Sequence, residues 1–305
     1  MSVLHELKSR VCPVCGSGPE AATLFLEQSI DPEKLNRFSF ASRKAPEFMS
    51  YRLLRCSPCS TVYAVAAPPS EALAHAYSEA SYDGTEEANL AGDTYLDALQ
   101  PFLVSLPPRA RALEIGTGTG VLLERLLGAG LHEVVGVEPS KAAIDAASER
   151  VRPFIKEGVF VESEFAPVTF DLICCFQTLE HVSDPKKLTE ACARLLRPGG
   201  LLAFVTHDYT ALVNRLLGRR SPIIDIEHLQ LFCRASLDRL LTTSGLTIES
   251  LTPLVNRYPL RYWLRLSPFP MAMKSAMQAS VRRIGLADLR LSVNVGNLIT
   301  IARKP

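Results

Sequence analysis

The stretch that decides the fold is Ala112-Leu-Glu-Ile-Gly-Thr-Gly-Thr-Gly120, in which a short apolar run is followed by three alternating glycines. The apolar run predicts a buried β-strand, and the helical pattern VLLERLL comes directly after it. Gly116, Gly118 and Gly120 permit a sharp turn and let a ligand approach the backbone where a Cβ would clash. The segment therefore predicts a strand, a glycine turn and a helix, with a ligand bound across the end of the strand.

A second strand supports a nucleoside as the ligand. The apolar run at residues 134–137 ends in Glu138, whose carboxylate can accept hydrogen bonds from both vicinal hydroxyls of a ribose. A nicotinamide dehydrogenase is the nearest alternative, but its Gly-x-Gly-x-x-Gly pattern places the third glycine one residue later than Gly120. This glycine spacing, together with Glu114 before the turn, favours a methyl donor.

The order of apolar runs predicts the fold class. From Arg111 onwards, short apolar runs alternate with helical segments, which is typical of a doubly wound, mostly parallel α/β sheet with helices on both faces. Two later strands are predicted in LTIESLTP and NLITIARK. Pro68 and Pro69 stop an earlier strand-like run and mark a boundary. The expected parts are a module at residues 1–69, a helical cover at 70–109 and the α/β domain at 110–305, with a basic insert at about 255–295.

The glycine turn and three later motifs resemble those of a known family. Glu114-Ile-Gly-Thr-Gly-Thr-Gly120 resembles motif I of the class I S-adenosylmethionine-dependent methyltransferases. Further similarities follow in the family's order, in Val135-Gly-Val-Glu-Pro139, in Phe170-Asp-Leu-Ile-Cys-Cys-Phe-Gln-Thr-Leu-Glu-His-Val182 and in Leu196-Arg-Pro-Gly-Gly-Leu-Leu202. The resemblance is strong over residues 105–206 and weaker over 225–252. It implies a Rossmann-like sheet of seven strands and S-adenosylmethionine as the cofactor.

The same resemblance implies which residues contact the cofactor. They are Glu114 at the amino group; Gly116, Thr117, Gly118 and Gly120 in the turn beneath the amino acid part; Glu138 at the ribose; Phe176 and Gln177 on the opposite side; and Glu162 near the adenine. The assignment of Glu162 rests only on the irregular segment between residues 156 and 164.

Two cysteine pairs in the first part predict a metal site. Cys12-Pro-Val-Cys15 and Cys56-Ser-Pro-Cys59 supply four thiolates in two tight turns, as tetrahedral zinc requires. A single pair could be a redox site, whereas two pairs in a small polar module favour zinc. Because cysteine fills all four positions, we expect a structural metal. The module resembles those of many bacterial small-molecule and sugar methyltransferases. A ribosomal-RNA guanine methyltransferase type is the lesser alternative, since it includes a histidine ligand and has closer pairs.

Charge and hydropathy restrict the partners and the location. The formal net charge of +1 gives no overall attraction to nucleic acid or to an anionic membrane, so nucleic acid is an unlikely partner. No apolar run approaches the ~18 residues of a spanning helix, and the start has no signal-peptide pattern, so we expect a cytoplasmic protein. The insert at 255–295 carries seven basic residues against one acid, Asp288. It could contact a membrane peripherally, cover the acceptor pocket, touch RNA or form a solvated helical layer.

Candidate general bases are few. His181 and His207 follow predicted strands, and His228 lies in a later loop, where each could reach an acceptor or serve only as a structural histidine. We predict an enzyme that transfers a methyl group to a small-molecule, sugar or lipid-linked acceptor, with oxygen as the favoured atom. The alternatives are an RNA methyltransferase and a non-catalytic binding module that retains the fold. The intact glycines and Glu138 favour the enzyme.

Overall fold

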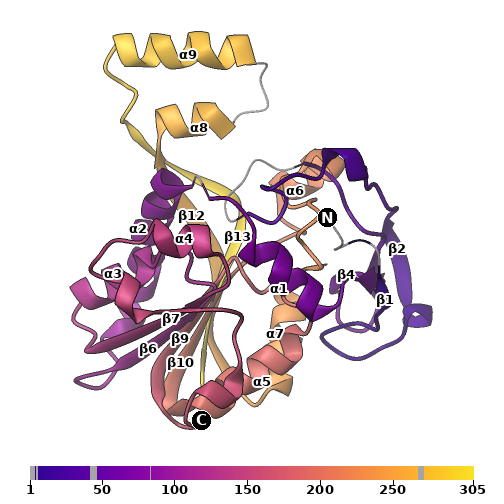
Figure 1. Cartoon of the computed structure of the whole chain (residues 1–305), viewed down its shortest axis with the longest axis vertical. Helices are drawn as coiled ribbons and strands as arrows, with labels where there is room; N and C mark the ends of the chain where they lie inside the picture. Colours follow the sequence, from indigo (N-terminus) through magenta and orange to yellow (C-terminus); the bar gives the residue numbers. More distant parts are fainter. Residues whose placement is uncertain (1–3, 5, 42–46, 83, 267–270) are drawn as a thin grey trace.

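The main body of the protein is one twisted sheet, in the strand order β12-β13-β10-β9-β6-β7-β8 (Figure 1). The computed structural model describes residues 4, 6–41, 47–82, 84–266 and 271–305. The strands are β6 (Arg111–Ile115), β7 (Glu133–Glu138), β8 (Ile155–Glu157), β9 (Phe170–Phe176), β10 (Leu196–His207), β12 (Thr247–Pro259) and β13 (Arg290–Arg303). Strands β10, β9, β6, β7 and β8 pair in parallel, while β13 is antiparallel to both β10 and β12. The prediction of a mostly parallel seven-stranded sheet is confirmed.

Helices cover both faces of this sheet. The helices are α1 (Ser70–Ser78), α2 (Thr85–Leu103), α3 (Val121–Gly128), α4 (Lys141–Asp145), α5 (Pro185–Leu195), α6 (Leu212–Leu217), α7 (Arg234–Thr243), α8 (Leu260–Leu266) and α9 (Met271–Arg283). Short 3-10 turns lie at Pro19–Ala21, Pro32–Lys34, Arg152–Phe154, Glu162–Glu164 and Gly218–Arg220.

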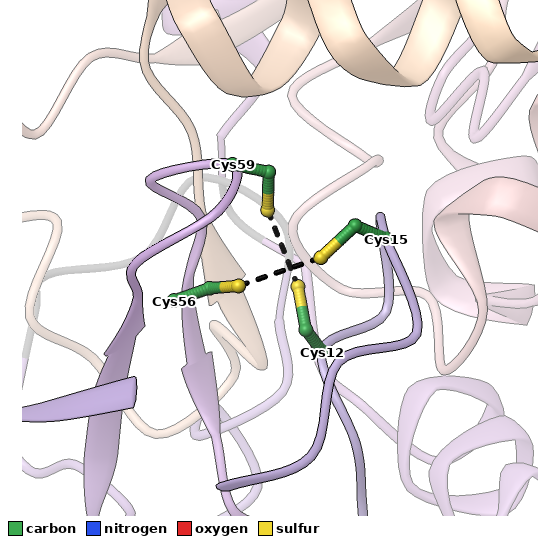
Figure 2. A group of neighbouring side chains, drawn as sticks. All are labelled: Cys12, Cys15, Cys56 and Cys59. Atoms are coloured by element: carbon green, nitrogen blue, oxygen red, sulfur yellow. Dashed lines mark hydrogen bonds between the residues drawn. The ribbon is translucent and has the colours of Figure 1, made fainter. Parts of the chain in front are cut away.

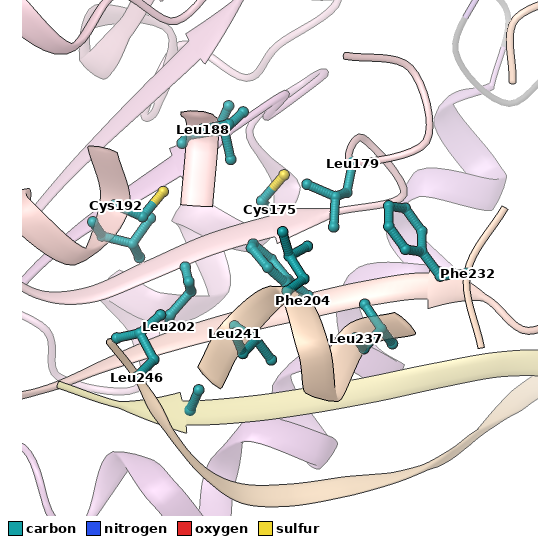
Figure 3. Close-up of a cluster of buried hydrophobic side chains, with 14 of the residues drawn as sticks. Cys175, Leu179, Leu188, Cys192, Leu202, Phe204, Phe232, Leu237, Leu241 and Leu246 are labelled. Atoms are coloured by element: carbon teal, nitrogen blue, oxygen red, sulfur yellow. The ribbon is translucent and has the colours of Figure 1, made fainter. Parts of the chain in front are cut away.

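The central strand β9 shows how the sequence divides between the two faces. Its residues alternate, so Leu172 and Cys174 pack with α2 and α3, while Ile173 and Cys175 pack with α5 and α7. Figure 3 shows part of the second cluster, in which the α7 residues Leu237 and Leu241 lie over the sheet. The continuous apolar run at residues 172–176 is therefore buried on both faces of the sheet, as in other parallel sheets.

The cysteine-containing part has its own small sheets. Its strands are β1 (Lys8–Ser9), β2 (Ala22–Leu26), β3 (Leu53–Cys56), β4 (Val62–Ala64) and β5 (Ala66–Ala67). The sheet order is β11-β4-β3-β2, and β11 (Gln230–Leu231) comes from the far half of the chain. A strand of the α/β domain thus completes the sheet of the cysteine module, and the two parts are joined by backbone hydrogen bonds.

The structure corrects the extent of the basic insert. Strand β12 continues to Pro259 and β13 begins at Arg290. Residues 255–259 and 290–295 of the expected insert therefore belong to two paired strands of one long hairpin. Residues 254–258 alternate between buried and exposed, a period-two pattern that is typical of a strand. Between these strands, α8 and α9 project beyond the sheet (Figure 1).

Two of the insert's basic residues are also less available than their sequence context indicated. Arg261 pairs with Asp288 and with Glu86, and the Arg265 guanidinium lies 3.8 Å from the Glu87 carboxylate. Both glutamates belong to the first turn of α2. The remaining basic side chains include Arg257, Arg282, Arg283 and Arg290, all of which are exposed.

The packing of α3 gives a first testable prediction. The Leu126 side chain is fully buried between α3 and the sheet, so Leu126→Ala should lower the free energy of unfolding by about 2–5 kcal/mol in urea denaturation. Leu216→Ala is the matched control, because Leu216 is 78% exposed and should change the value by no more than about 0.5 kcal/mol. Equal effects of the two substitutions would contradict this arrangement of the core.

Candidate active site

The glycine turn lies between the end of β6 and the start of α3. Gly116 has φ +75°, and a Cβ there would lie 2.2 Å from the Thr178 hydroxyl oxygen. Gly118 has φ +56°, but a Cβ there would meet nothing within 4 Å. Both positions therefore need glycine for their backbone conformation. Gly116 is also packed against the next loop, whereas Gly118 borders open space that a ligand can enter.

Glu138 joins this turn to the next strand. Its buried carboxylate accepts a hydrogen bond from the Gly118 amide at 2.7 Å and from the Ser140 amide at 2.8 Å. Burial raises the pKa of Glu138, and the two amide hydrogen bonds oppose that shift. Each carboxylate oxygen has a second lone pair, so the group can still accept from two ribose hydroxyls.

Two further residues from the cofactor prediction lie at the same edge of the sheet. Glu114 is buried near the end of β6 and accepts a hydrogen bond from the Thr117 hydroxyl within the turn. Phe176, at the end of β9, packs edge-on against Tyr95 of α2, with ring centroids 4.8 Å apart. The structure thus gathers these side chains around the turns after β6, β7 and β9.

Gln177 has features that fit a bound ligand. Its φ of +52° is a conformation that residues other than glycine seldom adopt, and it follows directly after β9. Within the described part of the chain, its side-chain nitrogen is buried and has no hydrogen-bond partner. A buried donor without a partner is costly, so a ligand that accepts its hydrogen bond would relieve that cost. The residues present therefore fit a polar cofactor in this position.

The expected position of Glu162 is wrong. Its carboxylate makes two hydrogen bonds, of 2.6 and 2.7 Å, with the Arg194 guanidinium in the last turn of α5. That turn leads into the start of β10, at the opposite end of the sheet from the glycine turn. The irregular sequence around Glu162 forms a 3-10 turn on the surface and does not reach the ligand edge.

Another acidic residue, Glu157, lies at the edge of the sheet that carries the glycine turn. Glu157 ends β8, and its backbone lies opposite Glu138 in the sheet register. It lines an open depression of about 440 Å³ between α1 and the ends of β7 and β8. The sequence signal was the charged residue at the end of the Ile155–Glu157 strand, which was too short to be recognised from its apolar pattern.

Three histidines lie close together at the same edge of the sheet as the turns after β6, β7 and β9. His181 comes from the loop after β9, His207 ends β10, and His228 precedes β11. The ring centroids of His181 and His228 are 4.9 Å apart, and those of His207 and His228 are 5.2 Å apart. His181 and His228, together with the Glu227 carboxylate, place one ligand atom each within 4.8 Å of one another, close enough to hold a cation.

The tautomer of His207 is set by a chain of amides. The Asn256 side-chain nitrogen donates to the Tyr258 hydroxyl at 2.7 Å, and the Asn297 nitrogen donates to the Asn256 oxygen at 3.3 Å. The Asn297 oxygen therefore accepts from Nδ1 of His207 at 2.9 Å, which leaves the lone pair on Nε2. Burial lowers the pKa of His207 to about 4, so its ring is neutral at pH 7. Such a weakly basic ring suits a hydrogen-bond acceptor better than a general base.

Sequence reasoning missed one carboxylate in this cluster. Glu180 is fully buried, and one of its oxygens accepts a hydrogen bond from the His207 amide at 2.6 Å. Its other oxygen has no partner among the residues that the structure describes. Burial raises the pKa of Glu180 to about 7. The available signal was its position directly before His181 in the loop after β9.

The four module cysteines converge, as the sequence predicts (Figure 2). The Sγ atoms of Cys12 and Cys59 are 3.4 Å apart, and those of Cys15 and Cys56 are also 3.4 Å apart. Tetrahedral zinc with Zn–S bonds of about 2.3 Å separates its sulfurs by about 3.8 Å, so a small expansion of this cluster would accommodate the ion. The donor set therefore fits structural zinc.

The family of the chain follows from a comparison with family models. A model described as a methyltransferase domain matches residues 87–251, more than half of the 305-residue chain. The chain belongs to this methyltransferase family. With its seven-stranded sheet and its glycine turn, it is a member of the class I S-adenosylmethionine-dependent group.

Curated relatives of this methyltransferase include bacterial ubiquinone biosynthesis O-methyltransferases. The protein from Aromatoleum aromaticum is 38% identical over 119 residues, which cover 35% of this chain and 49% of that protein. The one from Paracidovorax citrulli is 29% identical over 204 residues, covering 60% of this chain and 82% of that protein. The chain thus spans about half the length of the first relative.

Solved structures are more distant. A methyltransferase from Thermotoga maritima, described as a possible histamine N-methyltransferase, is 20% identical with a TM-score of 0.47. The match covers 72% of this chain and 91% of that one. In the part of the methyltransferase that the structure describes, every helix is too short or too polar to cross a membrane.

The lowered pKa of the partly buried His207 leads to a prediction about pH. An NMR titration of the His207 imidazole should have its midpoint near pH 4, and Asn297→Leu should move the midpoint lower, because the Asn297 hydrogen bond raises this pKa. The unfolded chain binds the proton at about pH 6.5, so His207 should reduce folding stability as the pH falls from about 6.5 to 4. A midpoint at or above pH 6 would rule out the buried, neutral ring.

Proposed function

We propose that this methyltransferase transfers a methyl group from S-adenosylmethionine to a hydroxyl of a small-molecule acceptor. The observation that carries the proposal is the Glu138 carboxylate, held beside the open glycine turn by the amide of Gly118. The two O-methyltransferase relatives support oxygen as the acceptor atom. Methyl transfer from S-adenosylmethionine follows from the family, whereas the hydroxyl acceptor is our inference.

Five parts of the site would contact the cofactor. Glu138 holds the two ribose hydroxyls, Glu114 receives the amino group, and the turn at Gly116–Gly120 passes beneath the amino acid part. Gln177 donates the hydrogen bond that its buried nitrogen cannot make within the described protein. Glu157 borders the space for the adenine. When bound, S-adenosylmethionine supplies a methyl group on a positively charged sulfur.

The histidine cluster handles the acceptor. His181 would accept the proton of the acceptor hydroxyl, and bound S-adenosylmethionine would supply the methyl group to the hydroxyl oxygen. His207 remains neutral and accepts a hydrogen bond through Nε2, which orients the acceptor. Tyr77 of α1 packs edge-on against His181, with ring centroids 6.0 Å apart, and helps to keep water from this side of the site.

The cysteine module completes this proposal as a structural zinc site. All four ligands are thiolates, three of the four cysteines are buried, and no open position is left for chemistry. RNA as the acceptor is the weaker alternative, because the formal net charge is only +1 and Arg261 and Arg265 are engaged by acidic residues.

We further propose that the small-molecule acceptor is linked to a lipid. Helix α6 exposes 71% of Leu212 and 78% of Leu216, beside the exposed Arg215. It packs against β13, the strand that carries the α8–α9 pair. Exposed leucines next to arginines can enter the headgroup region of an anionic membrane while the charges remain at its surface. Contact there would bring a membrane-held acceptor towards the histidine cluster.

Calorimetric titration with S-adenosylhomocysteine tests the cofactor site. The wild-type protein should bind in the micromolar range, and Glu138→Ala should weaken binding at least about tenfold, because a charge-assisted hydrogen bond contributes about 1.5–3 kcal/mol. Glu164→Ala removes an exposed carboxylate that pairs with Lys156 and is the matched control. No binding by folded, zinc-loaded wild-type protein would favour the non-catalytic binding module instead.

Vesicle sedimentation tests the membrane contact. The wild-type protein should sediment with vesicles that contain about one-third phosphatidylglycerol, and less protein should do so at 1 M salt, which screens the arginines. Replacing Leu212 and Leu216 by glutamate should abolish sedimentation. Val104→Glu, at an 83% exposed position after α2, should leave it unchanged. Equal sedimentation of all variants would exclude α6 as the contact and leave a soluble acceptor.

A further inference from the structure

One side chain of the cysteine module reaches deep into the α/β domain. Arg10 lies two residues before Cys12, and its amide donates to the Val65 carbonyl within the module at 2.8 Å. Its guanidinium donates to the Ser183 carbonyl at 2.8 Å, the Gln230 side-chain oxygen at 2.9 Å and the Leu229 carbonyl at 3.3 Å. Burial lowers the pKa of Arg10 to about 10, so it remains protonated at neutral pH.

Gln230 carries this connection to the loop that holds His181. Its side chain is fully buried, and its nitrogen lies 2.8 Å from the Leu179 carbonyl, 3.1 Å from that of Glu180 and 2.8 Å from that of Val182. These three carbonyls surround His181 in the sequence. The position of the His181 loop therefore depends on the orientation of one amide group, which Arg10 fixes from its other end.

The segment that holds His228 is tied to the same module. Leu229, the next residue, accepts a hydrogen bond from the Ala64 amide at 2.8 Å and donates its own amide to the Glu180 carbonyl at 2.9 Å. Strand β11 then pairs with β4, between the second cysteine pair and the end of the module. The segments that carry His181 and His228 are thus each hydrogen-bonded to the cysteine module, and they are also hydrogen-bonded to each other.

From these contacts we infer that Arg10 and Gln230 are positioning residues, through which the metal-loaded cysteine module sets the relative placement of His181 and His228. The inference rests on the proposed function in one respect, namely that the histidine cluster, to which His181 and His228 belong, faces the acceptor. The first cysteine turn anchors Arg10, so loss of the metal would loosen the guanidinium and then both loops. The glycine turn and Glu138 have no hydrogen bond to this network in the described structure and should remain unchanged.

The geometry explains why arginine is needed at this position. Three acceptors from two segments surround one planar guanidinium, which presents five N–H donors in a fixed arrangement. A lysine could keep the charge and some of the contacts but could not reproduce this geometry. Arg10→Lys should therefore retain part of the positioning, and Arg10→Ala should lose it.

Hydrogen–deuterium exchange on the full-length, zinc-loaded protein measures the positioning directly. In Arg10→Ala, amide exchange should rise about tenfold or more in residues 179–183 and 225–231, as expected when hydrogen bonds to a buried charge are lost. Arg10→Lys should give a smaller rise in the same two segments. Arg52→Ala is the matched control, because among the described residues this exposed arginine of the module forms an ion pair with Glu27 alone.

The metal is tested in the same way. Removing zinc from the wild-type protein with a chelator should raise amide exchange in the same two segments, 179–183 and 225–231. Removing zinc from Arg10→Ala should raise exchange within 179–183 little further. In both cases the affinity for S-adenosylhomocysteine should change by less than about threefold. A separate NMR measurement should show altered His181 and His228 imidazole signals in Gln230→Glu, whose carboxylate cannot donate to the three carbonyls.

The outcomes separate this inference from the proposed function. Unchanged exchange in both segments of Arg10→Ala, or a rise equal to that of Arg52→Ala, would overturn the inference whatever the cofactor affinity. If Arg10→Ala fails to fold, Arg10→Lys and Gln230→Glu are measured in its place. If neither variant changes amide exchange specifically in residues 179–183 and 225–231, the inference is overturned. Failure of the wild-type protein to bind S-adenosylhomocysteine would instead reject the proposed function, while the exchange pattern would still report the positioning.

Discussion

The buried carboxylate of Glu138 connects two strand ends and sets the geometry around them. It receives amide hydrogen bonds from Gly118, in the turn after β6, and from Ser140, after β7, so the two turns cannot move independently. The parallel sheet brings both turns to one edge, and glycine at position 118 leaves open space beside the carboxylate. Burial disfavours the charged form, and the amides restore it, which leaves a fixed acceptor ready for a polar ligand.

The groups of the histidine cluster, at the same edge of the sheet, differ from Glu138 in their electrostatics. Burial lowers the pKa of His207 and raises that of Glu180, so both groups are driven towards their neutral forms in a dry region. Their positions are held by backbone and amide contacts rather than by ion pairs. The cysteine module belongs to this arrangement, because Arg10 and the β4–β11 pairing attach it to the loops that carry His181 and His228.

Local patterns made the glycine turn, the acid beside it and the cysteine cluster predictable. The glycines at 116–120, the acid that ends β7 and the two cysteine pairs each need particular residues at fixed spacing, and such requirements are readable in one sequence. The strand residues up to Pro259 were missed because polarity does not follow burial there: Val255 is exposed, whereas Asn256 is buried. Glu162 was misplaced because its partner, Arg194, lies 32 positions away. The pairing of Arg261 with Glu86 depends on the tertiary fold, which no local pattern reports.

The central claim is that Glu138 and the adjoining glycine turn form the cofactor site of this methyltransferase. A crystal structure of the zinc-loaded protein with S-adenosylhomocysteine tests it most directly. We expect both ribose hydroxyls within hydrogen-bond distance of the Glu138 carboxylate, the amino acid part above Gly116–Gly118, and the Gln177 nitrogen donating to the ligand. A ligand bound elsewhere, with Glu138 contacting only Gly118 and Ser140, would contradict it.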